Sequence, residues 1–140
     1  MCTAFSSLQN MNVKTKGSEE RKKAMKEAIM HMKFATEIYE MQINEGRYFL
    51  HEHPLNATSW QLACIQRVRS MSNVVTVRAD QCMLGLKTKG NSGEEAFAMK
   101  PTRFMTNSTC IAAQLECRCD HSHEHTPLTQ GRAKNAAKYP

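Results

Sequence analysis

The sequence predicts an α/β fold in a single domain, with an incomplete doubly wound sheet. A long amphipathic segment comes first, and short apolar runs follow it at about 47–52, 74–78 and 102–106. A helix-length segment separates the first two runs. Connections of that length join parallel strands, so we expect a sheet that is at least partly parallel.

The first predicted element is a helix from residue 19 to about Asn44. Ser18 can cap its start, and Glu19 and Glu20 follow in the first turn, where the helix dipole favours negative charge. Gly46 is placed to end the helix. Its apolar positions share the spacing of one helical face: Met25, Ala28, Ile29, Met32, Ala35, Ile38, Tyr39 and Met41.

The run 47–52 predicts a strand that leads into His51-Glu52-His53-Pro54, where the proline disfavours a helix. A helix near 59–71 contains Trp60, which is expected to anchor the core. The β-branched run 74–78 predicts a second buried strand. The remaining predicted elements are a surface loop at 87–99, an extended piece at 102–106, a helix near 108–117 and a helical turn around 133–138.

The chain divides into an irregular segment 1–18, a partial domain 19–119 and a His-rich tail 120–140. Two or three strands make a poor parallel sheet, because such a sheet needs both faces covered. No glycine-rich turn of the kind that binds a nucleotide-type cofactor is present. The pattern therefore predicts the C-terminal half of a Rossmann-like domain that lacks its N-terminal, cofactor-binding half.

Net charge, apolar runs and cysteine content indicate which partners and which cellular compartment to expect. The net charge of +6 and a pI near 9.1 favour a polyanion such as nucleic acid, although the densest basic group, around 14–26, also fits the solvated end of a helix. There is no apolar run long enough to cross a membrane and no secretory signal, so we expect an intracellular protein, cytoplasmic or nuclear, without a membrane partner. In that setting the six cysteines are expected to be free thiols or metal ligands.

Polar groups stand where the predicted strands end. If the sheet is parallel, Glu52 and Arg103 converge on one edge, and Cys2 can join them from the start of the chain. A thiol nucleophile, an acid and an orienting cation form a set used in covalent catalysis. The alternative is that Cys2 belongs to a frayed terminus and Arg103 is a solvated strand cation.

Seven motifs carry a resemblance that covers nearly the whole chain. They are Cys2-Thr3-Ala4-Phe5-Ser6, the stretch 47–54 with Ser59-Trp60, Asp80-Gln81-Cys82-Met83-Leu84-Gly85, the stretch 100–107, His123-Glu124-His125, Gly131-Arg132-Ala133 and Tyr139-Pro140. In this order they resemble a methyltransferase-like segment of retroelement-type polyproteins from protists and related microbial eukaryotes.

That segment is in turn distantly similar to the cytosine-5 DNA methyltransferases. The resemblance implies that Cys2 matches the nucleophile, Glu52 the base-binding acid and Arg103 one arginine of a late strand. Met1 stands where the family has proline, and His53-Pro54 where it has Asn-Val. The turn that binds S-adenosylmethionine in the full-length relative has no counterpart here, so we expect no bound cofactor and no catalysis by this chain alone. The missing half of the domain is then an expected partner.

A second constellation contains zinc's preferred donors, thiolate and imidazole. Cys119, His123 and His125 form its centre, and the fourth donor is Cys110 or Cys82; the predicted set takes Cys110. The spacing differs from that of standard zinc fingers, and alternate residues of an extended run cannot converge without a turn. The alternative is a polar, His-rich loop beside cysteines buried on the last helix.

Three hypotheses follow. The first is an inactive fragment of a methyltransferase-like domain from a mobile element. The second is a small basic nucleic-acid-binding or zinc-stabilised module. The third is the product of a spurious reading frame or pseudogene that folds marginally.

Overall fold

The computed structural model describes residues 3–6, 18–90 and 93–128 of the chain. Its longest element is α1, Ser18–Asn44, which confirms the first predicted helix. Glu19 and Glu20 lie in its first turn, and Gly46 follows its end in the left-handed region at φ 69°, which glycine adopts without steric cost. A 3-10 turn, η1 (Thr3–Phe5), precedes α1 in the chain.

The main sheet has three strands, β1 (Leu50–Pro54), β2 (Val75–Asp80) and β5 (Pro101–Thr106), in the order β1-β5-β2. Both outer strands pair antiparallel with β5. The expectation of parallel pairing is therefore wrong. The crossover does carry the chain from β1 to a strand that points the same way, but β5 lies between the two, so they never pair.

The antiparallel arrangement bears on whether the domain is incomplete. A three-stranded antiparallel sheet needs only one well-covered face to be stable, so a missing half is not required by the strand count. The described strands do not confirm the Rossmann-like arrangement. What the structure shows is a mixed α/β fold.

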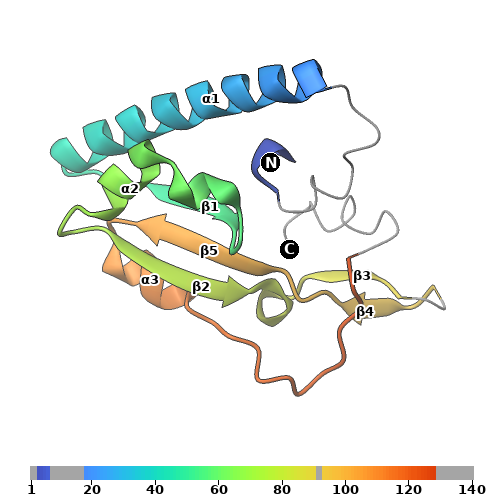
Figure 1. The fold of residues 1–140 in the computed structure, drawn as a ribbon. Helices are drawn as coiled ribbons and strands as arrows, with labels where there is room; N and C mark the ends of the chain where they lie inside the picture. Colours follow the sequence, from blue (N-terminus) through green and yellow to red (C-terminus); the bar gives the residue numbers. More distant parts are fainter. Residues whose placement is uncertain (1–2, 7–17, 91–92, 129–140) are drawn as a thin grey trace.

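The core lies between one face of the sheet and the layer formed by α1, η3 (Thr58–Gln61) and α2 (Ala63–Arg69), as Figure 1 shows. Trp60, 1% exposed, and Ile65, fully buried, are at its centre, as expected for Trp60. The indole nitrogen of Trp60 donates to the carbonyl of Pro54 at 2.9 Å, so the buried ring leaves no unpaired donor.

The opposite face of the sheet is covered by α3 (Thr109–Leu115), which packs on β2 and β5 (Figure 1). Ser108 caps this helix by accepting a hydrogen bond from the backbone N–H of Ile111 at 3.3 Å. Phe104 and Ala112 are buried between the sheet and the helix.

Residues 87–99, predicted as a loop, contain a small hairpin, β3 (Lys87–Lys89) and β4 (Glu95–Phe97). Buried Leu86 and Ala98 flank it and give it a core of its own. The 3-10 turn η4 (Gln81–Leu84) leads from β2 into this hairpin. The predicted helical turn at 133–138 lies outside the described residues.

After α3 the chain runs without helix or strand as far as residue 128, where the described part ends. One isolated parallel bridge joins Cys117 to Ala79 of β2, and another joins His125 to Phe97 of β4. The His-rich segment predicted as a separate tail therefore lies against the sheet edge and the hairpin in its described part, 120–128.

Candidate metal centre

The histidines of β1 are buried and face α1. His51 is 4% exposed, its Nδ1 lies 3.1 Å from the Tyr39 hydroxyl, and its ring meets Trp60 edge-on at 5.1 Å. Burial, and after it the neighbouring His53, lower the pKa of His51 to about 3. Its ring is therefore neutral at physiological pH, and its Nε2 has no hydrogen-bond partner among the described atoms.

His53 forms a second contact that the sequence did not predict, with the hydroxyl of Ser59, 2.5 Å from its Nδ1. A serine beside a histidine is the first half of a nucleophilic catalytic pair. Ser59, however, is completely buried, and burial also lowers the pKa of His53. The pair satisfies two polar side chains within the core and offers no accessible nucleophile.

The structure does not bring the predicted catalytic residues together. His53 is paired directly with Arg103, and Glu52 with Phe104. Side chains of successive strand residues point to opposite faces, so Glu52 and Arg103 lie on opposite faces of the sheet. Cys2 lies outside the described residues. The set Cys2, Glu52 and Arg103 stays a prediction without a common site.

Donor atoms do converge where η4 meets the C-terminal segment. One ligand atom each from Cys82, Cys119, His123 and His125 lies within 4.8 Å of the other three. The Cys119 Sγ lies 3.7 Å from Nε2 of His123 and 3.4 Å from Nε2 of His125. Both thiols are buried, at 2% and 8% exposure, and both imidazoles are half-buried.

These spacings fit a tetrahedral zinc ion. With Zn–S near 2.3 Å and Zn–N near 2.0 Å, tetrahedral geometry separates a sulfur from a nitrogen by about 3.5 Å. The two measured sulfur–nitrogen distances, 3.4 and 3.7 Å, lie on either side of that value. Two sulfurs and two nitrogens in this arrangement favour zinc over the harder cations, which prefer oxygen.

The surroundings hold Cys119 in position. The carboxylate of Asp80, only 1% exposed, accepts a hydrogen bond from the Cys119 backbone N–H at 3.1 Å. Arg78 donates to both oxygens of this carboxylate, with the shortest contact at 2.9 Å, so the buried charge is neutralised. The backbone N–H of His121 points at the Cys119 sulfur, 3.3 Å away, where it can stabilise a thiolate.

The chain turns at His121, the one non-glycine residue with positive φ (61°) in the described chain. Histidine enters the left-handed region more readily than most residues. The reversal lets Cys119 and His123, four positions apart, approach from the same side. His121 itself is exposed and is not among the four converging residues.

A thiol and an imidazole of the cluster have pKa values shifted in opposite directions. Burial raises the pKa of the Cys82 thiol to about 11, with Cys119 beside it adding to the rise. Burial, and then His123 and His121, lower the pKa of His125, so its ring is in the neutral, metal-binding form. A bound cation removes the proton from a coordinating thiol, which reverses the effect of burial.

Cys110, the predicted fourth donor, lies outside this cluster. It is exposed on α3, whereas Cys82, the other candidate, lies in the cluster. The strand ending at Asp80 delivers Cys82 two residues later, at the same sheet edge where Cys117 bridges to Ala79. All five described cysteines are free, as expected of thiols available for metal binding.

Comparison with known families, with curated proteins and with solved structures finds no match for this chain. Within the described ranges, none of the helices combines the length and apolar character that spanning a bilayer requires.

Proposed function

We propose that this chain is a small zinc-binding module in which one zinc ion fastens the C-terminal segment to the rest of the fold. The observation that carries the proposal is the convergence of four soft donor atoms, from Cys82, Cys119, His123 and His125, within 4.8 Å. Four protein ligands complete a tetrahedron and leave no position for water or substrate, so the zinc is structural.

Few backbone contacts hold the C-terminal segment, residues 116–128, against the rest of the fold. Between the end of α3 at Leu115 and residue 128 the chain pairs with the strands only through two isolated bridges. Ordering a backbone costs roughly 1–2 kcal/mol per residue, and isolated bridges repay little of it. Metal binding free energy can serve as folding free energy for such a segment.

Metal analysis of protein purified without a chelator tests the proposal. We expect one zinc per chain, and we expect chelation to lower the unfolding temperature and to loosen the segment in hydrogen exchange. Cys119→Ser should reduce the bound zinc to well below one per chain. Cys110→Ser removes an exposed thiol of the same type outside the cluster and is the matched control, with zinc content and stability unchanged.

A chain that is metal-free, and equally stable with and without chelator, contradicts the proposal. So does equal loss of zinc in the two cysteine variants, because that would place the metal elsewhere.

A further inference from the structure

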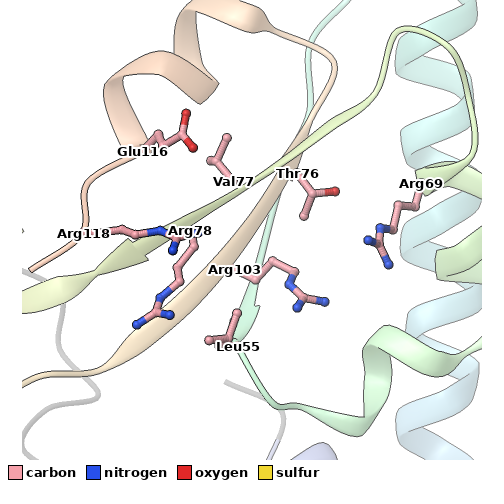
Figure 2. Close-up of a pocket in the computed structure, with 8 residues that line it drawn as sticks. All are labelled: Leu55, Arg69, Thr76, Val77, Arg78, Arg103, Glu116 and Arg118. Carbon is pink, nitrogen blue, oxygen red and sulfur yellow. The ribbon is translucent and has the colours of Figure 1, made fainter.

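A basic cavity lies against the main sheet, where Arg103 of β5 and Arg78 of β2 meet the segment that follows α3. It contains none of the four residues of the metal cluster. Its volume is about 330 Å³, and four of its lining residues are arginines: Arg69, Arg78, Arg103 and Arg118 (Figure 2). The sequence gives no sign of it, because these arginines are scattered over 50 positions. The fold gathers them.

Two strands, one helix and the segment after α3 supply the arginines. Arg78 on β2 and Arg103 on β5 are directly paired across the antiparallel ladder, so their side chains emerge on the same face. Arg69 ends α2 above that face, and Figure 2 shows it across from Arg103. Arg118 follows Cys117, which bridges to β2 at its outer edge.

The cavity holds more positive charge than the chain neutralises. Arg78 is paired with Asp80, but Arg69, Arg103 and Arg118 have no carboxylate within salt-bridge distance in the described ranges. Within the part of the chain that the structure describes, Glu116 is the one acidic residue that lines the cavity.

Arg103 is held in place within this group. Its guanidinium lies 5.2 Å from the centre of the buried Trp60 ring, which orients it. Burial, followed by repulsion from Arg69, lowers the pKa of Arg103. Asp80 offsets the charge of Arg78, so the repulsion on Arg103 comes from Arg69, and an anion bound between these two arginines would relieve it.

We propose that this cavity binds phosphate groups of a nucleic-acid backbone. The planar guanidinium matches phosphate with two parallel hydrogen bonds, and Thr76 adds a hydroxyl to the lining. Among the described residues no aromatic side chain lines the cavity, so they offer no stacking surface for a base and contact phosphate alone. The net charge of +6 draws a polyanion toward the chain.

The test is binding of a fluorescent single-stranded DNA 20-mer, followed by anisotropy over a range of salt concentrations. Arg69→Gln removes one exposed cavity charge. Arg67→Gln is its matched control: it removes the same charge from the same helix, but Arg67 pairs with Glu40 of α1, 2.7 Å away, and does not line the cavity.

We expect Arg69→Gln to weaken binding roughly tenfold at low salt, and to reduce the slope of log affinity against log salt by about 0.7, the value for one lost phosphate contact on a single strand. Arg67→Gln should change the affinity much less. Inorganic phosphate should displace the oligonucleotide more effectively than chloride at equal ionic strength.

Equal effects of the two substitutions overturn the proposal, because they would reflect net charge and not this cavity. Absence of oligonucleotide binding by the wild-type chain also overturns it, and so does binding of inorganic phosphate without the oligonucleotide. Neither substitution touches a proposed zinc ligand, so failure here leaves the metal proposal standing.

Discussion

Acid sensitivity of the buried His51 gives the sharpest quantitative prediction. In the folded chain the pKa of His51 is lowered from the ordinary 6.5 to about 3, chiefly by burial. The unfolded chain therefore takes up this proton first as pH falls. The stability contributed by the neutral ring is fully present above about pH 6.5 and is lost as pH falls from there toward 3.

The size of the effect follows from linkage. At pH 5 the unfolded histidine is largely protonated and the folded one is not, which costs about 2 kcal/mol of folding stability relative to pH 7.5. His51→Gln removes the titrating group and keeps a polar side chain near Tyr39. We expect this variant to be less stable at neutral pH, and its stability to fall by about 2 kcal/mol less than that of the wild type between pH 7.5 and 5.

Urea unfolding followed by circular dichroism at the two pH values measures this difference. His31→Gln is the control, because it makes the same substitution at a histidine that is exposed on α1, outside the core. Other histidines, including His53, contribute to the total in both proteins and cancel in the comparison. If wild type and His51→Gln lose the same free energy on acidification, the conclusion that burial keeps His51 neutral is refuted.

Two further pairs of substitutions test the core and the turn at the metal cluster. Ile65→Ala, at a fully buried position, should lower the free energy of unfolding by about 2–5 kcal/mol. Met41→Ala, at a position 52% exposed on α1, should change it by less than about 0.5 kcal/mol. Similar losses for the two variants in denaturant titrations would contradict the assigned core. His121→Gly should keep the bound zinc, since glycine adopts the left-handed backbone and His121 is not a ligand, but His121→Val should lower stability by about 1–2 kcal/mol because a β-branched residue is strained there. Loss of zinc in His121→Gly, measured by metal analysis, would show that the ring is a ligand.

The sequence predicted local elements well where the chain carries its own signals. The 3.6-residue spacing from Met25 onward, with Gly46 at the end, placed α1 correctly. Trp60 was correctly assigned to the core, because burying the large apolar surface of an indole ring stabilises a fold strongly.

Strand pairing was not predictable in the same way. The helical crossover between β1 and β2 indicates that these strands point the same way, which they do, but nothing in it shows that β5 inserts between them. The hairpin of β3 and β4 was missed because each strand is only three residues long, in a stretch rich in glycine and charge.

The metal cluster was predictable in part. Cys119, His123 and His125 lie close in sequence, so a single turn at His121 brings them together. Cys82 is 37 residues away from Cys119, and long-range contacts at the end of β2 bring it near: the bridge between Ala79 and Cys117 and the hydrogen bond from Cys119 to Asp80. The arginine cavity depends entirely on such long-range pairing, as between Arg78 and Arg103, and so carries no local sequence signal.

X-ray absorption at the zinc edge of the purified chain tests the central proposal most directly. The structure leads us to expect two sulfur ligands at about 2.3 Å and two nitrogen ligands at about 2.0 Å, with no water in the coordination sphere. A spectrum with oxygen and nitrogen ligands only, or protein without zinc that is nevertheless fully folded, would contradict it.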